Sequence, residues 1–171
     1  MGLGLLGGTA ARTLSGLGFS VAGWARSPRA IDGVECFHGA DGLAPFLART
    51  DILVVLLPLT RDTRHIVGRD ALYALPRGAR LVNCGRGGTV DEDALLAALN
   101  DGQISEATLD VFEREPLPSD HPFWGMDNVL VLPHTGSIAI PEVSAKDVVE
   151  NIRRIRTGQP LLNVVDRAKG Y

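Results

Sequence analysis

The sequence contains few cysteines, no long apolar run and little net charge, and each of these absences excludes a class of protein. Its two cysteines, Cys36 and Cys84, lie in unrelated segments. They provide no framework of bridges like that of a small secreted domain, and no Cys/His spacing predicts a zinc site. We expect both thiols to be reduced, which favours the cytoplasm.

The longest apolar run covers residues 52–57 and is far too short to span a membrane. Its length and β-branched content predict a strand that is buried on both faces. The first residues lack the basic start and continuous apolar stretch of an export signal. The formal net charge is −3, so nucleic acid and anionic membranes are not expected as partners.

The 171 residues are 45% hydrophobic and 22% charged, which is an ordinary composition for one globular domain over residues 1–171. Short apolar segments alternate with longer helical stretches along this length. Strands are expected over residues 20–24, 52–57, 80–84, 106–111 and 129–132. Helices are expected over residues 4–17, 42–49, 69–75, 91–101 and 141–157. The alternation predicts an α/β fold with a doubly wound, mostly parallel sheet.

Three glycines near the start, Gly2, Gly4 and Gly7, have the spacing of a dinucleotide-binding loop. The first permits a tight turn, the second lets a pyrophosphate approach the backbone, and the third allows close helix packing. The helix that begins here favours negative charge at its N-terminus, so Gly4, Leu5 and Leu6 are candidate cofactor contacts. No strand precedes the loop, so we expect a sheet without its first strand. A purely structural glycine turn is the alternative.

The segment that follows the expected strand 20–24 bears on which dinucleotide the chain binds. NAD-binding loops place Asp or Glu about 20 residues after the glycines, where the acid binds the ribose 2′-hydroxyl. This chain instead has Arg26, Ser27 and Arg29, and no acid between them. Arg26 can pair with a phosphate and Ser27 can donate a hydrogen bond to it. We therefore predict NADP(H) over NAD(H), with a solvated basic turn as the alternative.

Three further residues carry the chemistry: Arg86 within residues 82–88, Glu115 within residues 109–116, and His134 within residues 132–137. A cation, a carboxylate and an imidazole are the groups needed to reduce a 2-keto acid. Arginine can bind the substrate carboxylate, histidine can donate a proton, and the glutamate can keep that histidine protonated. Glu113 competes with Glu115 by sequence alone, and a surface turn, a loop acid and a strand-end cap remain alternatives for the three.

These segments, with the glycine loop and residues 56–63, resemble the Rossmann-like cofactor domain of the D-isomer-specific 2-hydroxyacid dehydrogenases. Within that family the chain is most similar to the NADPH-dependent glyoxylate/hydroxypyruvate reductases. The resemblance implies that Arg86 binds substrate, that His134 is the general acid and that Glu115 orients it. The resemblance also implies a set of cofactor contacts: Leu57, Pro58, Thr63, Cys84, Gly85, Asp110, which receives the nicotinamide carboxamide, His134 and Gly136.

Members of this family have two domains, and the resemblance implies that an N-terminal substrate domain is absent from residues 1–171. We therefore expect a parent enzyme that reduces a small 2-keto acid to a D-2-hydroxy acid, and little activity of the isolated chain. Homodimerisation is a further expectation from the family. An NADP(H)-sensing interaction module and a non-functional fragment are the competing hypotheses.

Overall fold

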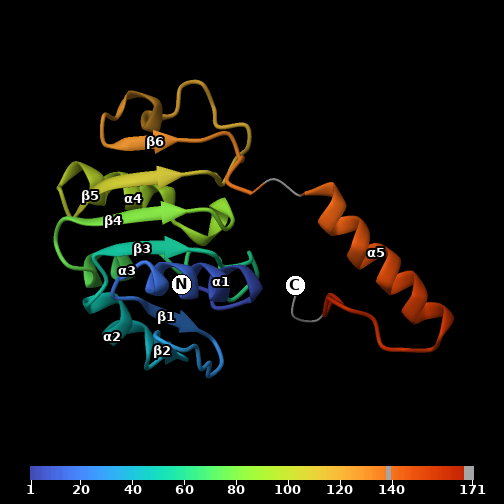
Figure 1. Cartoon of the computed structure of the whole chain (residues 1–171). Helices are drawn as coiled ribbons and strands as arrows, with labels where there is room; N and C mark the ends of the chain where they lie inside the picture. The colour runs from blue at the N-terminus through green and yellow to red at the C-terminus, as the bar shows by residue number, and fades with distance from the viewer. Residues whose placement is uncertain (138–139, 168–171) are drawn as a thin grey trace. The chain divides into compact units, whose positions relative to one another are not determined.

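The computed structural model of the chain describes residues 1–137 and 140–167 (Figure 1). Its contacts form two compact units, Met1–His134 and Thr135–Tyr171, which are described separately. The sequence alone is consistent with one domain over residues 1–171, and that assignment stays a prediction, because a domain can contain two such units.

The first unit is an α/β structure whose strands are all parallel, as the alternation predicts. One sheet has four strands in the order β3 (Ile52–Val55), β4 (Ala79–Asn83), β5 (Ile104–Leu109) and β6 (Val129–Val131). The other sheet pairs β1 (Ala22–Ala25) with β2 (Glu35–His38). The helices of this unit are α1 (Leu5–Gly16), α2 (Leu43–Ala48), α3 (Arg69–Ala74), α4 (Glu92–Asn100) and the short 3-10 helices Gly87–Thr89 and Pro122–Gly125.

The five expected strands and five expected helices are present, with ends that shift by a few residues. Helix α4 shows how a cap sets one of these ends. The Asp91 side chain accepts a hydrogen bond from Ala94 N at 3.0 Å and caps the helix, which therefore begins at Glu92. Strand β2 was not among the expected strands. It is four residues long and exposed at both ends, so it lacks the apolar alternation on which strand prediction depends.

The place of the expected missing strand is partly filled by the first residues of the chain. Gly2 N donates to Trp24 O at 2.8 Å, while Leu56 N donates to Met1 O at 3.0 Å. Met1 and Gly2 thus lie between β1 and β3 and connect the two sheets at one end.

The core lies between the four-stranded sheet and its helices. Leu53, Val55 and Leu81 of the sheet are fully or almost fully buried, as are Leu72 and Leu95 of the helices. The sequence predicts that the apolar run 52–57 is a strand buried on both faces. This is wrong for its first residue, because Ile52 is 51% exposed. On the side of β3 that faces β1, Ile52 borders a hollow rather than a strand.

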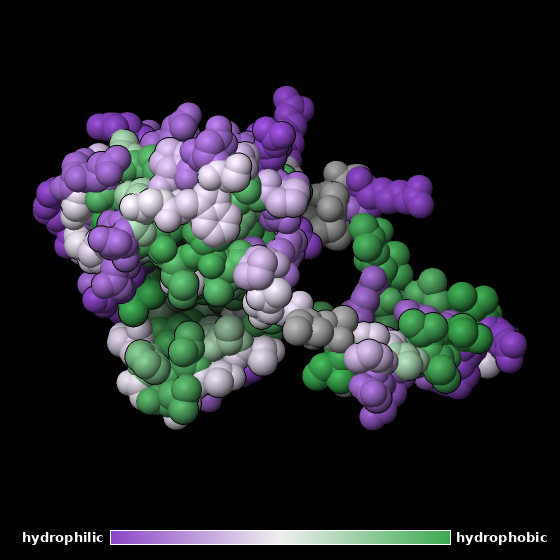
Figure 2. All heavy atoms as spheres, turned by 90° about the horizontal axis from the view of Figure 1, so that it is seen from above, coloured by the Kyte–Doolittle hydropathy of each residue, from purple (hydrophilic) through white to green (hydrophobic). Residues whose placement is uncertain are grey.

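The second unit contains α5 (Pro141–Arg156), which begins at Pro141 as expected. Arg153 and Arg154 lie in its last turn, where their positive charges interact favourably with the helix dipole. Both arginines also form ion pairs with Glu150. Figure 2 shows hydrophobic residues on the protein surface. Among the described side chains of α5, the exposed large hydrophobic residues are Val148, Val149, Ile152 and Ile155. Within the described ranges, no helix combines the length and apolar character needed to cross a membrane.

Candidate active site

The glycine loop has the geometry that dinucleotide binding requires. Gly2 has a φ of +92°, a conformation that favours glycine. A Cβ on Gly7 would lie 1.8 Å from Gly2 O, so only glycine lets α1 pack this closely. A Cβ on Gly4, in contrast, would meet nothing within 4 Å. The loop is therefore tight where it packs and open at Gly4, which fits the approach of a pyrophosphate.

Helix α1 leaves its first turn available to an anion. Its N-cap residue is Gly4, which has no side chain to bond the free amides. Leu5 and Leu6 follow and are 83% and 59% exposed. Because the first amides and the helix dipole both favour negative charge, these residues fit the phosphates of a dinucleotide.

The predicted specificity residues Arg26, Ser27 and Arg29 are exposed in the segment after β1. Arg26 Nη1 lies 3.9 Å from Asp62 Oδ2, a carboxylate in the segment after β3. The carboxyl ends of parallel strands share one edge of a sheet, which is where ligands bind in open α/β folds. Both side chains are largely exposed, so this long ion pair is weak and a phosphate can compete for the arginine.

The residues expected to line the cofactor along β3 and β4 lie against one another. A Cβ on Gly85 would be 2.8 Å from Leu57 O, so the segments after the two strands are in close contact. The Thr63 hydroxyl donates to Pro58 O at 2.6 Å, which holds the loop that carries Pro58. Burial raises the pKa of the Cys84 thiol, and Asp110 raises it further, so this cysteine is not an activated nucleophile.

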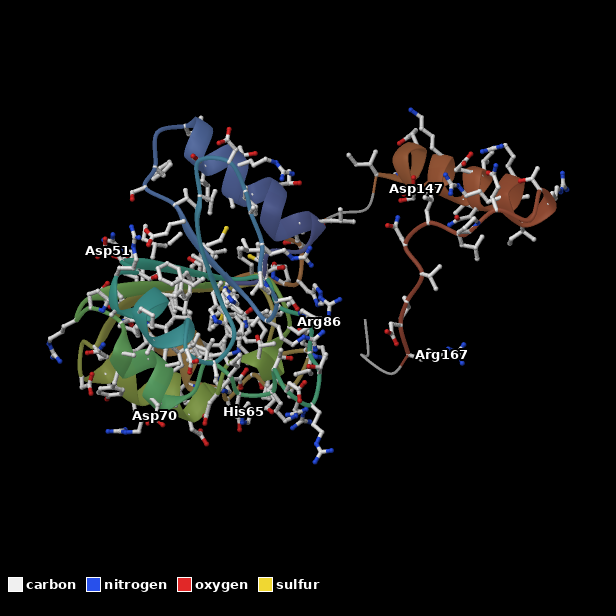
Figure 3. All side chains as sticks on the ribbon, turned by 90° about the horizontal axis from the view of Figure 1, so that it is seen from below. Asp51, His65, Asp70, Arg86, Asp147 and Arg167 are labelled. Carbon is white, nitrogen blue, oxygen red and sulfur yellow. The ribbon has the colours of Figure 1, made fainter. Side chains whose placement is uncertain are left out.

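Arg86 follows β4 and is exposed, whereas its backbone is firmly held. Its carbonyl oxygen accepts hydrogen bonds from the Thr89 hydroxyl at 2.6 Å and from Asn83 Nδ2 at 3.3 Å. Asn83 is only 1% exposed, and its Oδ1 accepts from Gly85 N at 3.1 Å. The arginine thus extends from a rigid loop toward solvent. Figure 3 labels it together with Asp51, which precedes β3 at the opposite end of the parallel sheet.

Gly87 joins the arginine loop to the loop that carries Glu115. A Cβ at this position would lie 1.8 Å from the carbonyl carbon of Phe112 and 2.4 Å from Glu113 N. The two backbones therefore touch, and no other residue fits without a shift. This contact sets the position of one loop relative to the other.

The side chains of Glu115 and His134 form a hydrogen-bonded pair. His134 Nδ1 lies 2.8 Å from Glu115 Oε2, and Phe112 N donates to Glu115 Oε1 at 3.0 Å. The hydrogen bond from His134, followed by that from Phe112, lowers the pKa of the Glu115 carboxyl, and the charge of Arg86 adds to this. His134 has a φ of 55°, and non-glycine residues in this strained region often lie at functional sites.

The geometry separates the two competing acids of this loop. Glu113 Oε1 pairs with Arg64 at 2.8 Å and with His65 Nε2 at 3.0 Å, away from His134. The backbone N–H of Glu113 donates to Glu92 Oε1 at 2.8 Å. Glu115 is therefore the acid that pairs with the candidate catalytic histidine, while Glu113 holds the loop.

Asp110 lies at the end of β5 and is 3% exposed; its N–H donates to Asn83 O at 3.0 Å. Gly136 belongs to the second unit, so its cofactor role stays a prediction.

Sequence reasoning missed Asn83, Thr89, Gly87 and Glu92, which position the site without being its chemical groups. Asn83 and Gly87 lie within the segment that singled out Arg86, and that proximity was the available signal. Among the described residues, no group of His, Cys, Asp and Glu is arranged to hold a metal.

A parallel α/β sheet, an open glycine loop at a helix N-terminus, and a histidine–glutamate pair with a nearby arginine define a Rossmann-like dinucleotide-binding domain. Comparison with known families gives the particular family. Residues 1–136 match the D-isomer specific 2-hydroxyacid dehydrogenase, NAD binding domain, and the chain belongs to this family.

Individual relatives give the same result. The glyoxylate/hydroxypyruvate reductase A of Yersinia enterocolitica is 42% identical over 171 residues, covering all of this chain and 55% of the relative. A D-isomer specific 2-hydroxyacid dehydrogenase from Xanthobacter autotrophicus Py2, solved with NADPH and MES, is 57% identical with a TM-score of 0.97 over 99% of this chain and 70% of that chain. The NADPH-dependent glyoxylate/hydroxypyruvate reductase of Sinorhizobium meliloti, solved with NADP and sulfate, is 45% identical with a TM-score of 0.95 over all of this chain and 55% of that chain. The chain spans about half the length of the curated relatives it matches.

Proposed function

We propose that this chain is the cofactor-binding part of an oxidoreductase that reduces a small 2-keto acid to the D-2-hydroxy acid. Glyoxylate and hydroxypyruvate are the proposed substrates. The observation that carries the proposal is the 2.8 Å pair of His134 and Glu115. Gly87, beside Arg86, packs against the backbone of Phe112, whose N–H donates to Glu115, and this supports a shared site. The names of the relatives support the same reaction.

Arg86 binds the substrate carboxylate in this mechanism. Its guanidinium is always charged and presents paired donors that match a carboxylate. The rigid backbone at Asn83 and Thr89 fixes where this cation begins, so the keto group is held in a constant position. The same donors polarise the keto oxygen.

His134 supplies the proton. Because its Nδ1 is bonded to Glu115, its Nε2 is the nitrogen that would donate the proton to the substrate. When bound, reduced NADPH supplies the hydride that adds to the carbonyl carbon. The electron pair of the carbonyl moves to its oxygen, which takes the proton from His134 Nε2 and leaves a neutral imidazole. Glu115 stabilises the protonated imidazole before this transfer.

NADPH is the proposed cofactor, and NADH a weaker substitute. Gly4 and the start of α1 accommodate the pyrophosphate, and Arg26 and Ser27 bind the 2′-phosphate. The absence of an acid between residues 25 and 29 supports this preference, because a carboxylate there would repel the phosphate. The NADPH and NADP in two of the related structures support it as well.

Two assays test the proposal. The 171-residue chain is titrated with NADPH and NADH and followed by nicotinamide fluorescence; tighter NADPH binding is expected, and no binding of either contradicts the cofactor assignment. The natural protein that contains these residues is then assayed for NADPH oxidation with glyoxylate and hydroxypyruvate. Nucleotide binding without turnover of any 2-keto acid would favour an NADP(H)-sensing module.

We also propose a cytoplasmic homodimer. The two free thiols, Cys36 and Cys84, support a reducing compartment, and the family resemblance supports a dimer. Sedimentation velocity on the natural protein tests the dimer, and fractionation of its host cells tests the location.

A further inference from the structure

Two side chains of opposite charge contact each other at the carboxyl edge of the strands. Arg26 is the first residue after β1, and Asp62 lies in the segment that follows β3. Arg26 Nη1 lies 3.9 Å from Asp62 Oδ2. The pair therefore joins the segments that follow two strands of different sheets.

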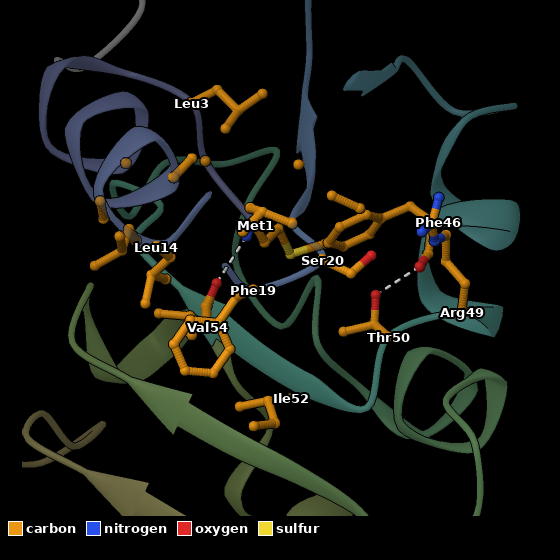
Figure 4. A pocket seen from close by; sticks show the side chains of 18 of the residues that line it. Met1, Leu3, Leu14, Phe19, Ser20, Phe46, Arg49, Thr50, Ile52 and Val54 are labelled. Atoms are coloured by element: carbon orange, nitrogen blue, oxygen red, sulfur yellow. Dashed lines mark hydrogen bonds between the residues drawn. The ribbon is translucent and has the colours of Figure 1, made fainter. Parts of the chain in front are cut away.

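The glycine loop begins between these two strands. Met1 N donates to Val54 O at 2.7 Å (Figure 4), and Gly2 N donates to Trp24 O at 2.8 Å. The first two residues are thus bonded to β3 on one side and to β1 on the other, and the chain continues from them into α1. The two charged side chains therefore approach each other from opposite sides of the loop that is proposed to bind the dinucleotide.

The backbone that carries Asp62 is held in a fixed turn. Thr63 Oγ1 accepts a hydrogen bond from Thr60 N at 2.7 Å and donates one to Pro58 O at 2.6 Å. Arg64 N donates to Thr60 O at 3.0 Å, which closes the turn around Asp62. The side chain of Asp62 is 75% exposed. Its carboxylate therefore extends from a constant position into solvent beside the cofactor loop.

The backbone before Arg26 is held as well. Ala25 O accepts a hydrogen bond from Gly39 N at 3.1 Å, and Gly39 O accepts one from the indole N–H of Trp24 at 2.8 Å. Beyond this anchor the long side chain of Arg26 is 53% exposed. Because the guanidinium can move further than the short carboxylate, Asp62 helps to determine where the arginine rests before a cofactor binds.

A carboxylate and a phosphate bind a guanidinium through the same donors. A 2′-phosphate that pairs with Arg26 therefore competes with Asp62, and the negative charge of that carboxylate also repels it. The ribose 2′-hydroxyl of NADH carries no charge and needs no arginine, so the same carboxylate opposes NADH much less. The cost is modest, because both side chains are largely exposed to water.

We propose that Asp62 is a specificity-determining residue that opposes NADPH by competing for Arg26. This inference rests on the proposed binding of NADPH. The preference for NADPH is then the difference between attraction by Arg26 and Ser27 and opposition by Asp62. The residue lies 36 positions after Arg26 in the sequence, and only the contact between the two side chains connects it with the cofactor.

The test replaces Asp62 with Asn in the natural protein that contains these residues, and titrates it with NADPH and NADH by nicotinamide fluorescence. The amide keeps the shape of the side chain and removes its charge. The dissociation constant for NADPH should fall about two- to fivefold, while that for NADH changes by less than about 1.5-fold. Raising the salt concentration to about 1 M should shrink the gain, because exposed charges are then screened.

Two further variants show where the charge acts. Asp51→Asn makes the same change in an exposed residue before β3, at the opposite edge of the sheet, and should leave both dissociation constants unaltered. In an Arg26→Ala background, Asp62→Asn should give a smaller gain, because the competition for the guanidinium is lost. An equal gain in that background overturns the proposal.

The titration also separates this inference from the cofactor assignment on which it rests. If the unmodified protein binds NADPH and Asp62→Asn binds it equally or more weakly, the proposal for Asp62 is overturned and the cofactor assignment stands. If the unmodified protein binds no NADPH, both are overturned.

Discussion

His134 Nδ1 lies 2.8 Å from Glu115 Oε2, while the other oxygen of that carboxylate accepts the backbone N–H of Phe112 at 3.0 Å. The backbone of its own loop thus helps to fix the carboxylate that pairs with the ring. Because Gly87 packs against the Phe112 backbone, the same loop is positioned against Arg86. The proposed proton donor, His134, and the proposed substrate-binding residue, Arg86, are therefore linked through two short loops.

Replacing Glu115 with Gln should lower kcat for glyoxylate reduction in the natural protein by roughly 10²-fold or more. The amide keeps the size of the side chain but removes the charge that favours protonated His134. Because this charge is gone, reduction should be lost at a lower pH than in the unmodified protein. Steady-state kinetics across pH measure both effects.

The matched control is Glu113→Gln, the same change two residues earlier in the loop. Glu113 pairs with Arg64 and His65 rather than with His134, so its pH profile should keep the unmodified shape. Equal pH profiles for the two variants would mean that Glu115 does not act through the histidine.

Asn83→Ala should destabilise the chain by about 1–3 kcal/mol, because the buried Gly85 N–H and the Arg86 carbonyl each lose a partner. Chemical denaturation of the variant and the unmodified chain measures the difference in the free energy of unfolding. Asn100→Ala, at the exposed end of α4, provides the control and should change stability little. A matching loss in both variants would contradict the role given to Asn83.

The sequence alone singles out the candidate chemical groups, since Arg86, Glu115 and His134 each lie in a distinctive local segment, and the structure brings Glu115 and His134 within hydrogen-bond distance. It could not decide between Glu113 and Glu115 from the residues alone. Both follow the same strand, and only the position of His134, 19 residues beyond Glu115, determines which acid reaches the ring. The role of Asn83 was hidden for a similar reason, because a buried asparagine at a strand end is recognised by its partners.

The fold shows the same division. Periodicity and helix caps predicted strands such as β3 and helices such as α4, because those signals are local. Strand β2 was missed, since its short sequence is defined by pairing with β1 rather than by its own pattern. The exposure of Ile52 was also unpredictable, because it depends on what lies beside β3 and not on the apolar run itself.

Arg26→Asp should lower the preference for NADPH over NADH at least tenfold, which corresponds to about 1.4 kcal/mol. The new carboxylate repels the 2′-phosphate and can bind the ribose hydroxyl instead. The ratio of the two dissociation constants, measured by fluorescence titration, reports this change. Arg12→Asp makes the same charge change on the exposed face of α1 and should leave the ratio unaltered. An unchanged ratio in Arg26→Asp would remove the basis for assigning 2′-phosphate recognition to this residue.

The buried amino group of Met1 should make the stability of the 171-residue chain depend on pH. Burial lowers the pKa of this group from 8.0 to about 5. Between these values the folded chain holds a neutral amine, whereas the unfolded chain binds a proton. The free energy of unfolding should therefore rise with pH from about 5 to about 8, by at most about 4 kcal/mol. Denaturant unfolding at pH 5.5 and pH 8 measures the rise, and Nα-acetylation, which removes the titrating group, should abolish this part of it. The same slope in the acetylated chain would show that other groups cause the dependence.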